Sequence, residues 1–344
     1  MSAAYATDDA HGAVPGHPPA IVTSELAKSF PGRHGTVEAV RGVSIAVSRG
    51  EIFGLLGPNG AGKTTTLRML TTLLPVEAGS ATVAGFDVSR HPRKVRQRIG
   101  YVSQVGGADE LATGHENLVL QGRLYGSPLH QVETRVAELV RVLDLAEFAH
   151  RRVKTHSGGQ RRRLDVALGI VHRPEVLFLD EPTTGLDPQN RVNLWEHLRS
   201  LRDVGTTIVL TTHYLEEADV LCDRLVIMDH GVVVAEGTPR HLKREVAGDA
   251  VVISIKDPGT AGGHVSALLG SQPFVREITA EGEHLRLYVD DGGAALPELL
   301  RLLDHAGIGI RSMSVSEPTL DDVFLRQTGR SLRDTAGSGP EVAA

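Results

Sequence analysis

Short apolar runs alternate with longer stretches of helical periodicity along most of the chain, beginning at Ile21. Each run is rich in Leu, Ile and Val, which is typical of strands that are buried on both faces of a sheet. The alternation predicts an α/β fold with a mainly parallel sheet. The expected strands are Glu51–Leu56, Ile99–Ser103, Val176–Leu179, Thr207–Leu210 and Leu225–Met228, and the expected helical stretches are Gly62–Leu74 and Thr113–Gly169.

The pattern changes near residue 248, where a second domain is expected to begin. The order of expected elements there is βαββαβ, which predicts a small α+β, ferredoxin-like layer of about 80 residues. Its expected elements are Val251–Ile255, Gly263–Leu269, Val275–Thr279, His284–Val289, Ala295–His305 and Ile308–Val315. We therefore expect domains at 21–248 and 249–328, with disordered tails at 1–20 and 329–344, because both tails lack any periodicity.

Composition and charge narrow the possible functions. The chain has 344 residues, and 36 Lys and Arg against 42 Asp and Glu give a net charge of −6, which argues against a nucleic-acid partner. The single cysteine, Cys222, excludes a disulfide framework and is expected to be a small buried apolar residue. No apolar run reaches the roughly 18 residues of a membrane-spanning helix, and no secretory signal is visible. These features predict a soluble, cytosolic protein.

A glycine-rich segment between an expected strand and an expected helix is the strongest chemical signal. It reads G-x-x-x-x-G-K-T, the phosphate-binding P-loop, in which backbone N–H groups and a helix N-terminus surround phosphates. Lys63 is expected to reach the β- and γ-phosphates of ATP, and the Thr64 hydroxyl to bind Mg²⁺. The candidate nucleotide-binding residues are Gly57, Pro58, Asn59, Gly60, Ala61, Gly62, Lys63, Thr64 and Thr65.

Two carboxylates follow the apolar run Val176–Leu179, at the end of a strand where ligands bind in open α/β sheets. Asp180 is suited to hold Mg²⁺ through water, and Glu181 to polarise an attacking water. A strand that merely ends in solvated acids is the alternative interpretation. The P-loop upstream favours the catalytic one.

The segment His156-Ser157-Gly158-Gly159-Gln160 resembles the LSGGQ signature of ATP-binding cassette (ABC) ATPases. Other family elements follow in the family's order over residues 21–245. Gln104 resembles the Q-loop glutamine, Asp187 lies in a segment that resembles the D-loop, His213 resembles the switch histidine, and Phe30 stands where the family has an aromatic residue that stacks on adenine.

The resemblance implies an ABC-type P-loop NTPase fold with a helical subdomain at about 105–165. It implies that Glu181, His213, Gln104 and Lys63 are catalytic, and that Thr64, Gln104 and Asp180 hold the metal. It also implies a head-to-tail homodimer, in which Ser157, Gly158, Gly159 and Gln160 contact the ATP of the other copy. His156 replaces the family's Leu and is expected to alter packing more than phosphate binding.

Further segments resemble the daunorubicin-resistance type of exporter ATPase, over about residues 21–328. They are Thr113–Leu118, Arg161–Asp165, Gly237–Lys243 and Glu317–Leu325. This resemblance implies a peripheral subunit on the cytoplasmic face of the membrane, which drives drug export through a separate permease that docks near residues 105–125. Export of a lipid or cell-wall glycan, and a cytosolic resistance or regulatory factor without a permease, are the alternatives. The C-terminal domain is assigned to dimer contact or regulation.

A basic cluster, Arg161-Arg162-Arg163, follows the signature segment. Nucleic-acid binding is disfavoured because no aromatic residues are interleaved with it. We interpret it as a solvated helix face.

Overall fold

The structure is a computed structural model that describes residues 18–32, 35–246, 249–255, 265–281, 284–316, 318–329 and 331. The chain divides into two compact units, Met1–Val234 and Ala235–Ala344. The expected tails at 1–17 and 332–344 lie outside the described residues. Ala20, which we expected to belong to the first tail, is buried, and its amide donates to Val47 O at 2.8 Å.

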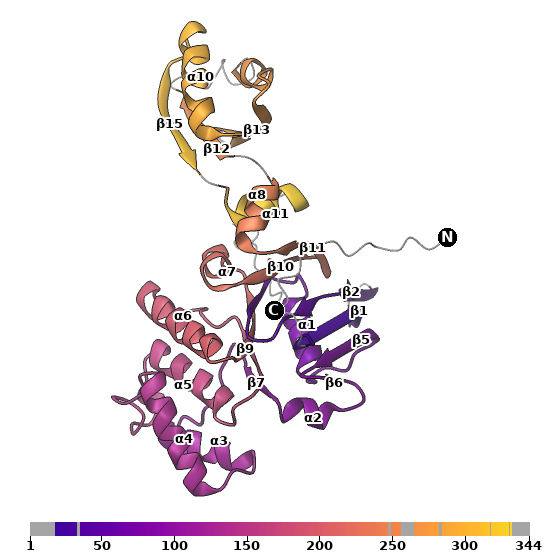
Figure 1. Ribbon diagram of the computed structural model, residues 1–344, viewed down its shortest axis with the longest axis vertical. Coiled ribbons are helices and arrows are strands. Elements are labelled where there is room, and N and C mark those ends of the chain that lie inside the picture. Colours follow the sequence, from indigo (N-terminus) through magenta and orange to yellow (C-terminus); the bar gives the residue numbers. More distant parts are fainter. Residues whose placement is uncertain are drawn as a thin grey trace. The chain divides into compact units, whose positions relative to one another are not determined.

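The first unit contains two sheets with helices on both sides of the larger one (Figure 1). Its elements are β1 (Ile21–Gly32), β2 (Gly35–Val43), β3 (Ala46–Val47), β4 (Ile52–Leu56), α1 (Lys63–Leu70), β5 (Ala78–Val83), β6 (Phe86–Asp87), α2 (Pro92–Arg96), β7 (Ile99–Val102), α3 (Gly114–Leu124), α4 (Leu129–Val142), the 3₁₀ turn η1 (Val153–Thr155), α5 (Gly158–Ile170), β8 (Val176–Asp180), α6 (Pro188–Asp203), β9 (Thr207–Thr212), α7 (Leu215–Leu221), β10 (Arg224–Asp229) and β11 (Val232–Gly237).

The larger sheet has the strand order β11-β10-β4-β9-β8-β7, and its pairs from β10 to β7 are parallel. Every residue of β4, β8 and β9 is buried, as expected for parallel strands covered on both faces. The predicted α/β class and the five predicted parallel strands are thereby confirmed. Since β9 lies between β4 and β8, the loops that follow these three strands meet at one edge of the sheet.

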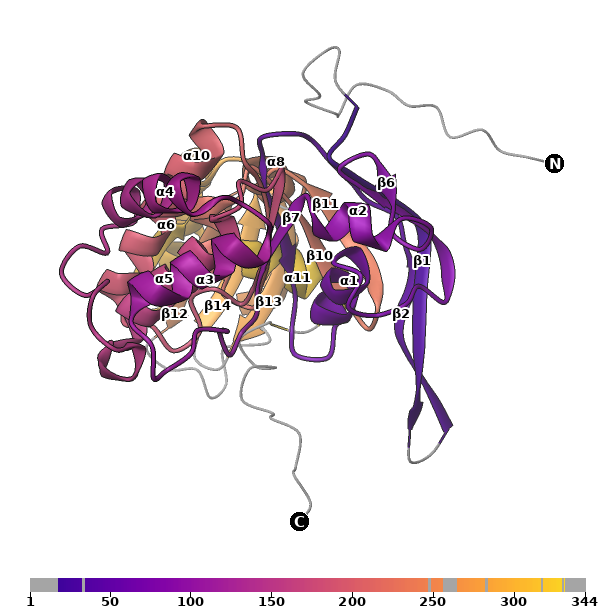
Figure 2. The same cartoon turned by 90° about the horizontal axis from the view of Figure 1, so that it is seen from below.

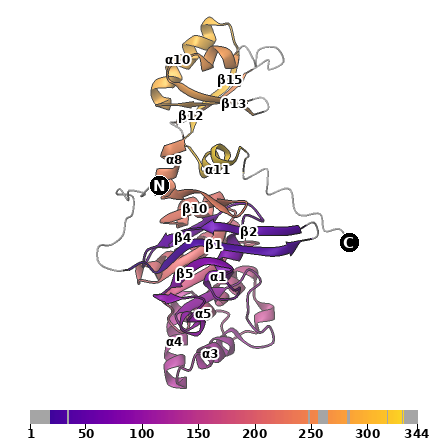
Figure 3. The same cartoon turned by 90° about the vertical axis from the view of Figure 1, so that its right-hand side faces the viewer.

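The smaller sheet, with the order β2-β1-β5-β6 and β3 beside β1, is antiparallel. Helix α1 contacts β2 and β5 of this sheet as well as β8 and β9 of the larger one, so it fills the space between the two. Figure 2 shows α5 and α6 on the opposite side of the larger sheet from α1, and Figure 3 shows β1, β2 and β5 side by side.

Cys222 is buried, as predicted, and burial raises the pKa of its thiol.

The second unit contains an antiparallel sheet with the order β13-β14-β12-β15. Apolar side chains of β12, β14, α10 and a helical segment at 265–270 form its core. Residues 263–264 of the expected helix lie outside the described residues. The elements are α8 (Pro239–Val246), β12 (Asp249–Ile255), β13 (Val275–Glu281), β14 (His284–Val289), α10 (Gly292–His305), β15 (Ile310–Ser316) and α11 (Leu320–Thr328).

The second unit begins earlier than residue 248, where the sequence pattern changes. The reason is that α8 packs against α11, the last helix among the described residues. Leu320, Val323 and Phe324 of α11 are fully buried, and so is Leu242 of α8. Among the described residues, no helix is long and apolar enough to cross a membrane.

Candidate active site

The P-loop occupies residues 57–62, between β4 and α1, and its shape depends on glycine at two positions. A Cβ atom at Gly57 would lie 2.2 Å from Met228 O, a distance shorter than a real Cβ atom can approach. Gly62 has a φ of +95°, and a Cβ atom there would lie 2.4 Å from Ala39 O. Glycine at these two positions lets the loop pack closely against β2 and β10. The loop amides and the N-terminus of α1 can then point into one phosphate-binding space.

Lys63, the first residue of α1, is buried, and its ammonium lies inside the loop. Its Nζ donates to Gly57 O at 2.6 Å and to Pro58 O at 2.9 Å. Burial lowers the pKa of Lys63, and the nearby carboxylates of Glu181 and Asp180 oppose that shift. Because an ammonium has three N–H donors, one is left for a phosphate oxygen.

Asp180 ends β8, and two threonine hydroxyls orient its carboxylate. Thr64 Oγ1 donates to Asp180 Oδ1 at 2.9 Å, and Thr211 Oγ1 donates to the same oxygen at 2.6 Å. The parallel register, in which Asp180 pairs with Thr211, produces the second bond. No described residue donates a hydrogen bond to Oδ2, and no described cation forms an ion pair with Asp180. This buried carboxylate beside a hydroxyl is a set of hard oxygen ligands that fits Mg²⁺.

Glu181 follows with a φ of +45°, in the left-handed region that non-glycine residues seldom adopt. Such strain is concentrated at functional sites. Gln104 Nε2 and Thr184 Oγ1 each donate to Glu181 Oε2 at 3.1 Å, and His213 Nδ1 lies 3.3 Å from Oε1. The His213 imidazole lowers the pKa of Glu181 most, and Lys63 contributes, so this carboxylate is held in its charged form. Four predicted catalytic residues therefore form one cluster.

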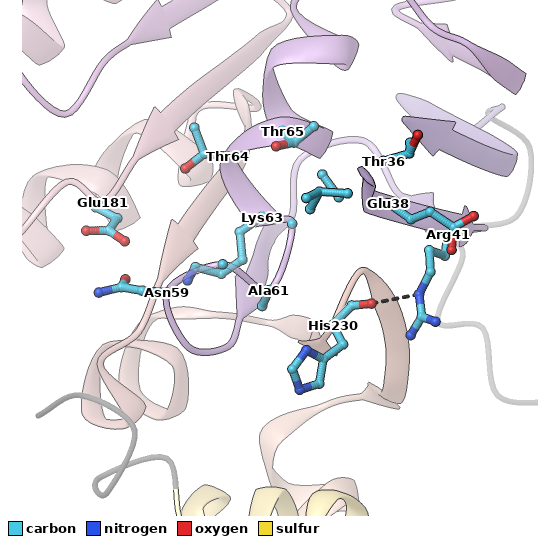
Figure 4. Close-up of a pocket in the computed structure, with 14 residues that line it drawn as sticks. Thr36, Glu38, Arg41, Asn59, Ala61, Lys63, Thr64, Thr65, Glu181 and His230 are labelled. Carbon is cyan, nitrogen blue, oxygen red and sulfur yellow. Dashed lines mark hydrogen bonds between the residues drawn. The ribbon is translucent and has the colours of Figure 1, made fainter. Parts of the chain in front are cut away.

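A cavity of about 930 Å³ opens over the P-loop. Figure 4 shows Thr64 and Glu181 on one side of the loop, and Arg41 and His230 on the other, where Arg41 Nε donates to His230 O at 2.8 Å. The sequence analysis did not identify the lining that β2 contributes, because β2 carries no distinctive motif. The lining residues are Thr36, Val37, Glu38, Ala39, Arg41, Asn59, Gly60, Ala61, Gly62, Lys63, Thr64, Thr65, Glu181 and His230.

Phe30, the expected adenine-stacking residue, is absent from this lining. It lies on β1, half-buried, and pairs in register with Val37, which does line the cavity. Lys28 Nζ lies 5.6 Å from the centre of the Phe30 ring.

The signature segment and the D-loop form a second cluster. Ser157 caps α5, and its hydroxyl and amide exchange hydrogen bonds with Gln160. A Cβ atom at Gly159 would lie 2.3 Å from Asn190 Oδ1, and Asn190 is held by Asp187, which caps α6. None of these residues lines the cavity over the P-loop.

His156 packs beneath this cluster. Its ring lies edge-on to Phe148, with 5.0 Å between the centroids, and Nε2 lies 3.1 Å from Phe148 O and 3.3 Å from Arg151 O. Burial lowers the pKa of His156. The His156 ring, at the position of the family's leucine, therefore packs on Phe148 and also contacts two backbone carbonyls.

The interpretation of Arg161-Arg162-Arg163 as a solvated helix face was wrong for Arg162. Arg162 is buried, and its guanidinium donates to Pro182 O and Ser103 O, both at 2.7 Å, and to Asp180 O at 3.1 Å. It thus joins the signature helix α5 to the ends of β7 and β8, next to Gln104 and Glu181. A rigid guanidinium fork suits such a role, and the sequence carried no signal that separates Arg162 from its neighbours.

Glu217 on α7 is a further buried acid that the sequence analysis missed. It is fully buried, and Trp195 Nε1 of α6 donates to Glu217 Oε1 at 3.2 Å. Burial raises the pKa of Glu217, against the opposing effect of the Thr212 and Thr183 hydroxyls. This residue links the helix after the D-loop to the strand that carries His213.

Comparison with known proteins defines the class. The family "ABC transporter" matches residues 40–184. The solved structure titled "Structure of ATP binding subunit of ABC transporter" aligns with a TM-score of 0.58 at 28% identity, over 65% of this chain and 92% of that one. The dimeric structure of a post-hydrolysis state of the ATP-binding cassette MJ0796 bound to ADP and Pi aligns with a TM-score of 0.59 at 24% identity, over 63% and 98%, which supports the fold alone.

The C-terminal part and the curated relatives narrow this further. The family "ATP-binding protein DrrA1-3-like, C-terminal domain" matches residues 237–328. Daunorubicin resistance ATP-binding protein DrrA2 of Streptomyces coeruleorubidus is 42% identical over 90% of this chain and 96% of its own length. Daunorubicin/doxorubicin resistance ATP-binding protein DrrA of Streptomyces peucetius is 43% identical over 92% and 94%. The chain therefore belongs to the ABC transporter family, as an ATP-binding subunit that hydrolyses ATP to drive transport.

Proposed function

We propose that this chain powers the export of hydrophobic drugs or antibiotics through a separate membrane permease. The observation that carries the proposal is the likeness to drug-resistance ATP-binding proteins over nine-tenths of the chain, including the C-terminal domain. Linearmycin resistance ATP-binding protein LnrL of Bacillus subtilis, 36% identical over 90% of this chain and 99% of its own length, extends the likeness to a second antibiotic.

Export of a different cargo is the second candidate. Nod factor export ATP-binding protein I of Burkholderia lata is 43% identical over 88% of this chain and 96% of its own length. The alternative of a lipid or glycan cargo therefore stays open. The residues of the ATPase site do not discriminate between the two cargoes, because the chemistry proposed for them acts on ATP.

Mg²⁺ is proposed to bind at Thr64 and Asp180, with Gln104 nearby. The Thr64–Asp180 hydrogen bond, and a buried Asp180 carboxylate that forms no ion pair among the described residues, support this assignment. When bound, the ion would neutralise charge on the β- and γ-phosphates. Lys63 would donate to the same phosphates, Glu181 would orient the attacking water, and His213 would hold Glu181 in position.

A head-to-tail homodimer is proposed to complete the site. The support is that the signature segment forms its own cluster with the D-loop and lines no part of the cavity over the P-loop. Gly158 is also open: a Cβ atom there would meet only Leu186, at 3.9 Å. A second copy would bring its Ser157, Gly158 and Gly159 to the γ-phosphate, so that ATP favours the closed dimer and hydrolysis releases it.

The permease is proposed to dock on the segment 105–125, which places the subunit at the cytoplasmic face of the membrane. Apolar side chains are exposed there to an unusual degree: Val105 by 91%, Leu111 by 70% and Leu124 by 72%. Exposed apolar residues within one segment are typical of an interaction site. The chain has a net charge of −6, which disfavours binding to the phosphates of nucleic acid, so we propose no nucleic-acid partner.

The second unit is proposed to be a ferredoxin-like domain, at about 249–328, that serves dimer contact or regulation. The strand order β13-β14-β12-β15, antiparallel throughout, supports the ferredoxin-like arrangement. The described residues of this unit contain no cluster of metal-ligating side chains that would suggest chemistry of its own.

One set of experiments tests the proposed function. The Glu181→Gln variant should bind ATP without turnover and elute as a dimer in ATP but as a monomer without it, measured by light scattering after size exclusion. Glu147→Gln, at an exposed glutamate of the helical part, is the matched control and should behave like the wild type.

Co-expression with the candidate permease then tests the transporter assignment. The tagged subunit should co-purify with the permease from detergent-solubilised membranes, and cells that express both should tolerate more daunorubicin than cells with the Glu181→Gln variant. Retention of the tolerance with Glu181→Gln, or a permease that never accompanies the subunit, would contradict the proposal.

A further inference from the structure

The residues around α2 form a strongly basic surface in an acidic protein. Five cationic residues fall within the nine residues 90–98, and all five are exposed. We propose that this surface binds the anionic head groups of membrane lipids. We name it the α2 basic patch, and it consists of Arg90, Arg93, Lys94, Arg96 and Arg98.

The structure holds several of these side chains in place. Lys94 Nζ and the Arg98 guanidinium lie over the Phe86 ring, 5.2 and 4.9 Å from its centre. Arg96 donates to Thr72 Oγ1, at the end of α1, at 2.9 Å. Because these cations are already ordered by the ring and the hydroxyl, they lose less conformational entropy when they bind an anion.

The carboxylates that face the patch do not neutralise it. Glu175 forms ion pairs with Arg98 and, at 2.8 Å, with Arg49, so one acid is shared between two arginines. Asp87 accepts from the backbone amides of Ser89 and Arg90. The five cations of the patch and Arg49 carry six positive charges, and Asp87 and Glu175 carry two negative charges. Among these described residues, four positive charges are therefore in excess.

Exposed apolar side chains border the patch, as an interfacial membrane site requires. Leu73 is 54% exposed and adjoins Thr72, the partner of Arg96. On the other side, Tyr125 stacks on His172 at 3.6 Å, and His172 Nε2 lies 2.9 Å from Ile99 O, next to Arg98. The C-terminal end of α3 is therefore linked to the patch through His172 and Ile99, and Figure 1 shows α2 and α3 at the same end of the first unit.

A cationic surface with apolar margins fits a phospholipid head-group layer, because the charges meet the phosphates and the apolar tips reach the acyl boundary. Single-stranded nucleic acid fits less well. It needs an open aromatic face for base stacking, and the Phe86 ring is half-buried and covered by two cations. The inference rests on the proposed membrane location, and it adds a contact that needs no permease.

The test is co-sedimentation of the full-length protein, without permease, with vesicles of equal parts phosphatidylglycerol and phosphatidylcholine. Vesicles of pure phosphatidylcholine are the comparison. The wild type should bind the anionic vesicles, with an affinity that falls as salt is raised. The Arg93→Glu/Lys94→Glu variant should lose about tenfold or more in affinity, and Arg93→Gln/Lys94→Gln about half of that loss on a logarithmic scale.

A matched control reverses two exposed charges elsewhere. Arg141→Glu/Lys154→Glu changes the net charge by the same amount on α4 and η1, and should bind anionic vesicles much more tightly than the patch variant. Equal binding by the two variants would overturn the proposal. So would wild-type binding to a fluorescent oligonucleotide without any binding to vesicles.

Co-purification with the permease separates this inference from the proposed function. If the wild type accompanies a permease but ignores anionic vesicles, the patch proposal fails and the transporter assignment stands. If it binds vesicles through the patch but never accompanies a permease, the transporter assignment fails and the patch stands.

Discussion

Two buried aspartates, one in each unit, have very different surroundings. Among the described residues, the Asp180 carboxylate accepts hydrogen bonds only from the neutral hydroxyls of Thr64 and Thr211, while its backbone carbonyl accepts from the Arg162 guanidinium. Asp322, at the start of α11, accepts from the Arg286 guanidinium and the Tyr288 hydroxyl, both at 2.8 Å, and from Thr319. The Asp322 carboxylate forms an ion pair with Arg286 within its own unit, whereas the Asp180 carboxylate forms none among the described residues, although the charges of Lys63 and Arg162 act on it.

The difference distinguishes an acid that stabilises the fold from an acid whose surroundings suit the proposed role in ATP hydrolysis. A buried charge is costly unless it is paired, so an unpaired carboxylate persists where a ligand supplies the missing charge. The Asp322 contacts join α11 to β14, and therefore connect the last helix of the chain to the sheet of the second unit. The hydrogen bonds to the Asp180 carboxylate come from neutral hydroxyls, so they orient it without forming an ion pair.

The largest expected effect comes from removing the charge at Asp180. Asp180→Asn keeps the side-chain shape but removes the anionic ligand, so Mg²⁺-dependent ATP hydrolysis should fall on the order of 10²-fold or more. Asp322→Asn should hydrolyse ATP at nearly the wild-type rate. Phosphate release with saturating Mg²⁺ and ATP measures both. Similar rates for the two variants would remove the contrast.

The reverse contrast is expected in stability. Asp322→Ala leaves Arg286 and Tyr288 without their shared acceptor, and should lower the free energy of unfolding of the second unit by about 2–3 kcal/mol. Urea unfolding followed by circular dichroism measures this. Asp304→Ala, at an exposed acid of α10, is the matched control. A loss no larger than that of the control would mean that Asp322 has no structural role.

The pH dependence of stability should differ in sign between Asp322 and Glu217. Burial alone would raise the pKa of Asp322, but hydrogen bonds from Thr319 and Tyr288 and the charge of Arg286 lower it below its ordinary value of 3.8. Its contribution to stability is therefore present above pH 3.8 and is lost as the pH falls through the lower, folded-state pKa.

Burial raises the pKa of Glu217 above its ordinary value of 4.5, so the folded protein holds that proton more tightly. Stability from this group therefore decreases as the pH rises above 4.5 toward the folded-state pKa. Urea unfolding midpoints should be measured from acidic to neutral pH. In Asp322→Asn the midpoint should depend less on pH below 3.8, and in Glu217→Gln it should depend less on pH above 4.5. Unchanged profiles in both variants would contradict these roles.

The smallest effect is expected at His156. His156→Leu restores the more common signature residue, keeps the packing on Phe148 and loses two contacts with carbonyl oxygens. The free energy of unfolding should change by about 1 kcal/mol or less, with ATP hydrolysis close to the wild type. A large loss of activity would show that the histidine acts on the phosphate-binding face after all.

Local sequence patterns were sufficient to predict much of the fold and the residues that surround the P-loop. The P-loop, the two acids after β8 and the strand that leads to His213 are contiguous segments, and their periodicity and spacing do not depend on distant residues. The buried Arg162 could not be predicted, because its three carbonyl partners come from loops after two strands. Helix α11 was likewise missed, since its apolar side chains are buried against α8, far away in the sequence.

The sequence by itself determined the order of buried strands and the residues that can hold a nucleotide, because these depend on short-range spacing and on side-chain type. Only the tertiary structure decided which buried carboxylate forms an ion pair inside its own unit and which does not. That choice depends on the distance between side chains brought together from separate strands and helices. The sequence distinguishes Asp180 by its place after an apolar run downstream of the P-loop, whereas only the structure shows that Asp322 is paired with Arg286 inside its own unit.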